Sequence, residues 1–333
     1  MKKVSSSLMA LFIVNLILNQ ANGQGIIRVT VGMDLQTEIN NATSGSIFLV
    51  EHTSGNSIVV DKQVFIIGKG YKLGTLNTEV SQVRFIEGSD NSTITGMTIS
   101  NSIYVGADNI TVKRNLVHGS IYIGRLSSAS YQNIKISNCQ ILQNYIESRI
   151  DFSLDPTNTI IKNNIIIDDI EVCSSCTGVA INNTILNEGN CNQEFDDSYE
   201  MPFFNNIIYS SCYYPSKPDG NYPTNSTFVH NIFRDTHYIT SQPTNISLTS
   251  FSNEFSGYPS FSGALLDARF QLKSSSAAIG AGLDGVDCGA FGGPDPYVLN
   301  GIPEGPNILE VSTPSGAAAG QTITVNIQAV NQN

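Results

Sequence analysis

The sequence predicts an all-β protein, a single-stranded right-handed parallel β-helix with an N-terminal cap and a short C-terminal β-hairpin tail. Three observations support this fold class. Short segments of alternating apolar residues recur about every 23 residues, a small polar residue follows each, and no sustained helical period appears after residue 23. Strands this close together leave no room for the helix of a βαβ unit. Three short strands per turn of a right-handed solenoid fit the spacing.

The segment NITVKRNLV, residues 109–117, illustrates the repeat. Ile110 and Val112 fall on one face of a strand and Thr111 on the other, as period two requires. Each such segment therefore predicts one strand and one corner of a coil. Related segments are NIKISNCQI (133–141), NTIIKNNII (158–166), STFVHNIF (226–233) and NISLTSFSNEF (245–255).

One corner of every coil is predicted to carry a ladder of small residues. Stacked amide side chains can hydrogen-bond from coil to coil, and Gly and Asn both tolerate the left-handed backbone of a tight corner. Asn is abundant here, so chance is the alternative, but an apolar residue two positions after most anchors argues against it. The predicted ladder is Gly68, Gly96, Asn115, Cys139, Asn164, Asn183, Asn206, Asn231 and Asn253.

The first 23 residues are predicted to be a signal peptide. Two lysines precede an apolar run over residues 8–18, and small residues at 21–23 suit cleavage. A membrane anchor is the alternative, but it needs about 20 apolar residues, and Asn15 and Asn19 interrupt this run. We therefore expect a secreted, periplasmic or cell-surface protein that has no membrane span after cleavage.

The remaining chain is predicted to form a β-helix domain over residues 24–300 and a short β tail over 301–333. Residues 25–44 are expected to cap the first coil with a strand and a helical turn, because a solenoid must cover its open ends. In the tail, residues 308–312 and 322–330 are expected to pair as a hairpin.

The formal net charge is −11, which disfavours nucleic acid as a partner because phosphate binding depends on Lys and Arg. Trp is absent, but 13 Tyr remain as stacking surfaces. Six cysteines in an exported chain favour disulfides. Two bridges among four cysteines are expected, with the pairing left open and a zinc site as the alternative. These four are Cys173, Cys176, Cys191 and Cys212.

The chain resembles the right-handed parallel β-helix repeat proteins of the pectate-lyase-like superfamily. GSIFLVEHTSGNSIVVDKQVFIIGKGY (45–71) is similar to their opening coil, and FQLKSSSAAIGAGLDGVDCGAFGG (270–293) to their closing segment. The resemblance covers roughly residues 40–300 and implies the fold. It leaves the activity open, because this architecture is found in lyases, hydrolases, adhesins and inert scaffolds alike.

Four basic residues, Lys113, Arg114, Lys135 and Lys162, fall on successive coils and are interpreted as one basic flank. The resemblance implies two roles for such a flank: a Lys or Arg removes the proton beside a uronic-acid carboxylate, and carboxylates hold calcium. Asp168 and Asp169 are the candidate calcium ligands. A solvated flank with compensating charges is the alternative.

The catalytic signatures of the family are absent; there is, for example, no Gly-His-Gly. We therefore expect a protein that binds polysaccharide or a cell-surface component along one flank without strong catalysis. The alternatives are a calcium-assisted polysaccharide lyase or a glycoside hydrolase acting on acidic polysaccharide, and a structural adhesin. Calcium is the only cofactor that the resemblance implies, and the sequence predicts no particular oligomeric state.

Overall fold

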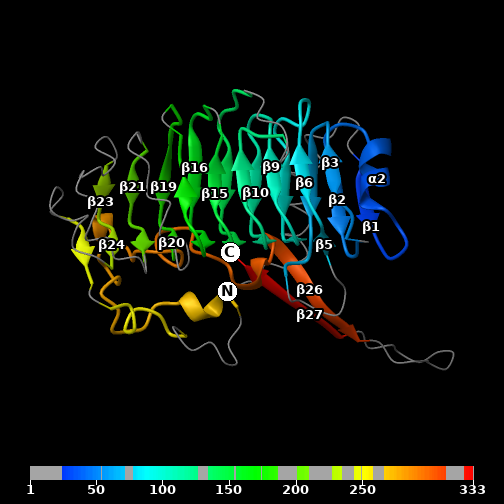
Figure 1. Cartoon of the computed structure of the whole chain (residues 1–333). Coiled ribbons are helices and arrows are strands. Elements are labelled where there is room, and N and C mark those ends of the chain that lie inside the picture. The colour runs from blue at the N-terminus through cyan, green and yellow to red at the C-terminus, as the bar shows by residue number, and fades with distance from the viewer. Residues whose placement is uncertain are drawn as a thin grey trace, which may run out of the picture.

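The computed structural model describes residues 25–332 except 54, 72–77, 127–133, 154, 174, 187–200, 210–226, 235–243, 249, 258–265 and 313–325. The predicted signal peptide, residues 1–23, lies outside the described residues, as do Cys191 and Cys212. The chain winds as a parallel β-helix, with three parallel sheets that run along one axis (Figure 1). The predicted fold class is confirmed.

Sheet A is the longest of the three sheets and has ten strands. In spatial order they are β1 (Ile26–Val29), β2 (Ser46–Val50), β4 (Val64–Ile67), β7 (Thr93–Thr95), β10 (Thr111–Lys113), β13 (Gln140–Leu142), β16 (Thr159–Lys162), β19 (Gly178–Ile181), β21 (Phe203–Phe204) and β23 (Phe228–Val229). Between β4 and β19 each coil passes from sheet A to sheet C, then to sheet B, and back to sheet A; after β19 the described strands of the coils belong to sheets A and C.

Sheets B and C contain the remaining strands of the coils. Sheet B consists of β3 (Ile58–Val60), β6 (Val83–Phe85), β9 (Ile103–Val105), β12 (Ile121–Ile123), β15 (Ile150–Phe152) and β18 (Ile170–Glu171). Sheet C consists of β5 (Glu79–Val80), β8 (Thr98–Ile99), β11 (Leu116–Val117), β14 (Tyr145–Ile146), β17 (Ile165–Ile166), β20 (Thr184–Ile185), β22 (Ile207–Ile208), β24 (Ile232–Phe233) and β25 (Ile246–Ser247).

The core is a column of like residues stacked in parallel register. Val112 pairs with Ile94 on one side and Ile141 on the other, and Ile141 pairs with Ile161. All four side chains are fully buried. Each buried apolar side chain of this kind contributes about 1.5–3 kcal/mol to folding relative to exposure.

The first coil is capped as predicted (Figure 1). The helix α2 (Leu35–Asn41) follows β1 and buries Leu35 and Ile39 over the end of the core. Its N-cap is Asp34, whose carboxylate accepts a hydrogen bond from the backbone N–H of Thr37 at 2.9 Å. No helix among the described residues is long and apolar enough to span a membrane.

An asparagine ladder follows sheet A in successive coils. Each Asn Nδ2 donates to the Oδ1 of the next at 3.0–3.3 Å. The same Oδ1 also accepts from the backbone N–H of the preceding Asn. The buried amides are thereby satisfied in a continuous chain. The ladder consists of Asn115, Asn144, Asn164, Asn183, Asn206, Asn231 and Asn245.

Two predicted ladder positions, Cys139 and Asn253, are wrong. Cys139 lies at the corner before sheet A, where its thiol donates to the carbonyl of Ala107. Asn144 holds the ladder position of that coil. Asn253 is exposed in a turn, and Asn245 closes the ladder only 14 residues after Asn231. Loop lengths differ so much between coils that the spacing of the repeat predicts the wrong residue in these two coils.

Gly68 and Gly96 lie at the same corner but one position before the ladder. A Cβ on Gly68 would lie 2.1 Å from the carbonyl oxygen of Gly96, and a Cβ on Gly96, whose φ is +69°, would lie 2.4 Å from Cγ of Pro303, so neither site accepts a side chain. In later coils the position of Gly96 remains left-handed, with φ between 53° and 57°. The residues there are Arg114, Gln143, Asn163, Asn182, Asn205 and His230, which we call the outer column.

Residues 266–304, the return segment, run back along the outer column toward the N-terminal coils (Figure 1). They include three short 3₁₀ turns, η1 (Ala268–Phe270), η2 (Leu283–Gly285) and η3 (Leu299–Gly301). Their apolar residues, such as Phe270 and Tyr297, cover the outer face of sheet C and form a second hydrophobic core with Tyr145 and Ile207. The return segment thereby closes this side of the solenoid.

The outer column holds the return segment by hydrogen bonds. From the C-terminal coils to the N-terminal coils, successive residues of the column bind successive residues of the return segment. The partners are Ala281 for His230, Leu283 for Asn205, Asp287 for Asn182, Ala290 and Gly292 for Asn163, Asp295 and Pro296 for Gln143, and Ile302 for Arg114. Beyond the return segment, β26 (Gly305–Ser312) and β27 (Asn326–Gln332) pair as an antiparallel hairpin. The hairpin extends from the solenoid (Figure 1), and its pairing was predicted.

Candidate functional site

The predicted basic flank is divided between two corners of the solenoid. Lys113 and Lys162 share one row of sheet A, because both register with Leu142. Each forms an ion pair with the return segment: Lys113 with Glu304, and Lys162 with Asp295 at 2.7 Å. Hydrogen bonding from these lysines lowers the pKa of both carboxyl groups.

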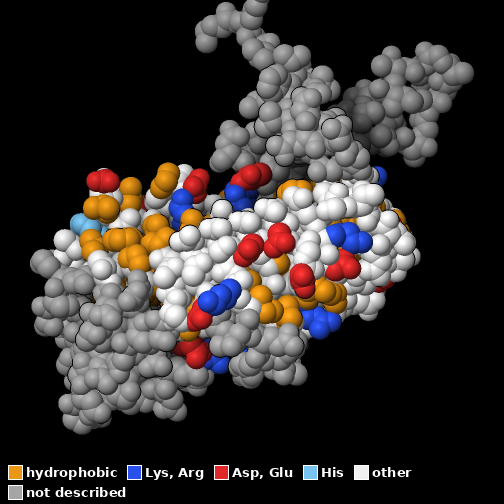
Figure 2. All heavy atoms as spheres, turned by 90° about the horizontal axis from the view of Figure 1, so that it is seen from above, with side chains coloured by type: hydrophobic (Ala, Val, Ile, Leu, Met, Phe, Trp, Pro, Cys, Tyr) orange, Lys and Arg blue, Asp and Glu red, His pale blue; other side chains and the backbone are white. Residues whose placement is uncertain are grey.

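Arg114 belongs to the outer column and is 5% exposed. Its guanidinium donates to Gln143 Oε1 at 2.7 Å and to the carbonyl of Ile302 at 3.0 Å, and burial lowers its pKa. Arg114, Lys113 and Lys162 therefore fasten the return segment to sheet A. On the face shown in Figure 2, basic and acidic side chains of the described residues lie side by side, without a continuous basic strip.

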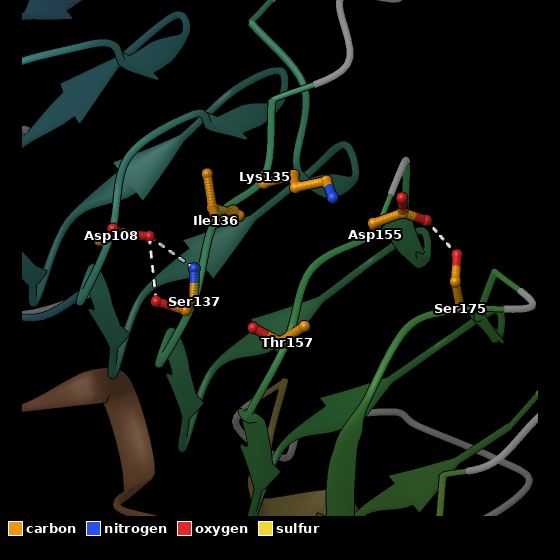
Figure 3. A pocket seen from close by; sticks show the side chains of 7 residues that line it. All are labelled: Asp108, Lys135, Ile136, Ser137, Asp155, Thr157 and Ser175. Atoms are coloured by element: carbon orange, nitrogen blue, oxygen red, sulfur yellow. Dashed lines mark hydrogen bonds between the residues drawn. The ribbon is translucent and has the colours of Figure 1, made fainter.

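Lys135 lies at the opposite corner, between sheets B and A, and lines a hollow of about 390 Å³ (Figure 3). Its side chain is exposed and forms no ion pair with any described residue. We call this site the corner hollow; it is lined by Asp108, Lys135, Ile136, Ser137, Asp155, Thr157 and Ser175. Four successive coils contribute these residues.

Two aspartates of the corner hollow are fixed by hydroxyl and backbone donors (Figure 3). Asp108 Oδ1 accepts from the backbone N–H of Ser137 at 2.6 Å and from its hydroxyl at 3.2 Å. Asp155 Oδ1 accepts from the hydroxyl of Ser175. Asp155 has φ +58°, so the turn that carries it is also left-handed. The carboxylates are thereby held in place before any ligand arrives.

The hollow offers donors and acceptors in close alternation. The ammonium of Lys135 is a donor, the two carboxylates are acceptors, and the hydroxyls of Thr157 and Ser175 can act as either. The ionised groups of the lining sum to one negative charge. Such a lining suits a ligand that carries hydroxyl groups better than a ligand that carries carboxylates.

Asp168 and Asp169 lie in the turn between sheets C and B and are not part of the corner hollow. Asp169 is 7% exposed, and its Oδ1 has no hydrogen-bond partner among the described residues. Burial, together with the charge of Asp168, raises the pKa of Asp169 to about 7. The neighbouring Arg149 pairs with Glu171 at 2.7 Å.

Asp168 and Asp169 are a poor fit for calcium. Calcium takes six to eight oxygen ligands. Within the described residues, no group of three or more His, Cys, Asp or Glu side chains is placed to hold a metal ion. The predicted calcium site thus lacks a ligand set in this part of the chain.

Sequence reasoning selected Lys135 but missed Asp108, Ser137, Thr157 and Ser175 of the same hollow. The available signal was the second set of left-handed asparagines, Asn91, Asn109, Asn138 and Asn158, which have φ between 54° and 63°. They mark the corner before sheet A in four coils, and the residues next to them stack.

Of the predicted disulfide cysteines, Cys173 and Cys176 are bonded to each other.

No protein-family model matches this chain, and a search of curated proteins finds no relative.

Proposed function

We propose that the protein is an exported β-helix that binds a neutral polysaccharide in the corner hollow. One observation carries the proposal: carboxylates, hydroxyls and an ammonium that forms no ion pair with any described residue line one accessible hollow, and they come from successive coils. Neighbouring parallel strands lie about 4.8 Å apart. Groups repeated at that spacing suit successive hydroxyls of an extended glycan chain.

The charge arrangement favours a neutral ligand over an acidic one. Three of the four basic residues of the expected flank contact the return segment, which leaves Lys135 to meet a ligand. The whole chain carries a formal charge of −11, which repels polyuronates at low ionic strength. The resemblance to pectate-lyase-like β-helix proteins supports a glycan as the ligand. The Cys173–Cys176 disulfide supports export, because disulfides persist in oxidising compartments.

Affinity electrophoresis in gels that contain a soluble polysaccharide tests the proposal, with neutral glucans, mannans and xylans compared against pectate and alginate. We expect retardation by a neutral polysaccharide and weaker binding, by several-fold, after Asp155→Asn. Asp284→Asn is the matched control, because Asp284 has the same left-handed backbone as Asp155 but is exposed and lies in the return segment. Retardation by the polyuronates alone, or none on the whole panel, would contradict the proposal.

A second candidate function, glycoside hydrolysis, rests on Asp169. A buried carboxyl with a pKa of about 7 is protonated at the pH where a general acid must donate. Asp151 and Glu171, which pair on neighbouring strands, lie close enough to raise that pKa further. They would supply the second carboxylate that glycosidases need.

Release of reducing ends from the same polysaccharides tests this second candidate. We expect activity that falls as the pH rises above 7 and is lost in Asp169→Asn, with the fold checked by circular dichroism. Absence of reducing ends from every polysaccharide that the protein binds would exclude hydrolysis and leave binding alone.

A further inference from the structure

The Cys173–Cys176 disulfide lies at the wall of the corner hollow. Ser175, between the two cysteines, lines the hollow and donates a hydrogen bond to Asp155, which also lines it (Figure 3). Its hydroxyl is 3.9 Å from the Sγ of Cys173. The bridge therefore borders the ligand-facing residues.

The two cysteines are anchored differently. Cys176 is fully buried in the main core, and its backbone N–H donates to the carbonyl of Cys173 at 3.2 Å. The next residue, Thr177, donates to the carbonyl of Pro156 at 3.0 Å. Cys173 is half-buried and packs against the edge of the same core. The core fixes one end of the four-residue loop, and the disulfide fixes the other.

We propose that this disulfide controls ligand binding in the corner hollow, so that the site binds strongly when the bridge is oxidised and weakly when it is reduced. The inference rests on the proposed function. With the bridge intact, the wall of Ser175 and Asp155 is ordered in advance, so the ligand does not bear the entropy cost of ordering it. With the bridge open, Cys173 is released, and the Ser175–Asp155 hydrogen bond loses its restraint.

The redox step is a thiol–disulfide exchange with a dithiol reductant. A thiolate of the reductant attacks Sγ of Cys173, the more accessible sulfur, and Cys176 leaves as a thiolate that takes up a proton. The second thiol of the reductant then resolves the mixed disulfide. Two electrons and two protons pass to the protein, giving two thiols, and the reductant becomes a cyclic disulfide.

Affinity electrophoresis with the neutral polysaccharide that binds the oxidised protein tests the proposal. We expect binding to weaken by about three- to tenfold after treatment with dithiothreitol and to recover on reoxidation. The double variant Cys173→Ser with Cys176→Ala should bind like the reduced protein and should not respond to dithiothreitol. Ser175→Ala, with the bridge intact, should lose part of the same affinity.

The outcomes separate this proposal from the proposed function. If the oxidised protein binds and neither reduction nor the double variant weakens binding, the redox proposal is wrong while the binding function stands. If the oxidised protein does not bind at all, both are wrong. If circular dichroism shows that the double variant is unfolded, the bridge is a folding brace, and the redox proposal is overturned.

Discussion

At the scale of single residues, the ladder asparagines satisfy groups that have no access to water. Asn164 accepts two hydrogen bonds from Asn144 and donates to Ile141 and Asn183, with no exposed surface. A buried donor or acceptor left without a partner costs about 1–3 kcal/mol. The ladder position therefore depends on the amide and not merely on a small side chain.

Asn164→Ala is expected to lower the free energy of unfolding by about 2–4 kcal/mol, because it strands several buried groups at once. Chemical denaturation measured by circular dichroism checks this. Asn253→Ala is the matched control and should change stability by less than about 0.5 kcal/mol, since Asn253 is exposed and outside the ladder. Equal changes in unfolding free energy at both sites would contradict the stabilising role of the ladder.

Asp169 makes stability depend on pH. Its pKa is about 7 in the folded protein and 3.8 as the ordinary value, so the folded state binds more protons between these values. Stability therefore falls as the pH rises from about 4 to 7 and stays low above 7. Asp169→Asn should flatten this slope and raise stability at pH 8 by about 2–4 kcal/mol. Urea denaturation across this pH range tests the expectation; an unchanged slope would contradict it.

At the scale of elements, the return segment is held by polar side chains of the outer column. Asn163 is fully buried and donates to the carbonyls of Ala290 and Gly292, both at 2.8 Å. Tyr71 and Tyr297 both donate to the buried Asp267, which also receives the backbone N–H of Asn300. These contacts join distant parts of the chain, so the return segment is part of the folded domain.

Asn163→Gly keeps the left-handed conformation but removes the two hydrogen bonds to the return segment. We expect a loss of about 2–3 kcal/mol in unfolding free energy and faster proteolysis within residues 281–304. Asn138→Gly is the matched control, because Asn138 has φ +59° but is exposed and contacts no residue of the return segment. Equal losses of unfolding free energy in the two variants would mean that the loss comes from the added backbone flexibility of Gly and not from the hydrogen bonds to the return segment.

The elements that the sequence predicted best are those with a strict local signal. The period-two strands around Ile110, the cap before Leu35 and the tail hairpin all follow from neighbouring residues. The register between neighbouring coils could not be predicted from neighbouring residues. NITVKRNLV (109–117) aligns in space with NCQILQNYI (138–146), not with NIKISNCQI (133–141), because the turn before β13 is long and both corners carry asparagines.

At the scale of the whole molecule, the same register error merged two corners into one basic flank. Lys135 and Lys162 look equivalent in sequence, but they lie at different corners of the coil. The partners of Lys113 and Lys162 come from residues about 130–190 positions later, and no local pattern reveals them. The corner hollow is likewise assembled from four coils, so only the stacked structure brings its residues together.

The most direct test of the central claim, that Lys135 meets the ligand while Lys162 serves the fold, compares Lys135→Ala with Lys162→Ala. Affinity for the bound neutral polysaccharide is measured together with unfolding free energy. We expect Lys135→Ala to weaken binding about tenfold at unchanged stability, as loss of a charged hydrogen bond does. Lys162→Ala should keep full binding and lose at most about 1 kcal/mol of stability. Weakened binding in Lys162→Ala with full binding in Lys135→Ala would contradict the account.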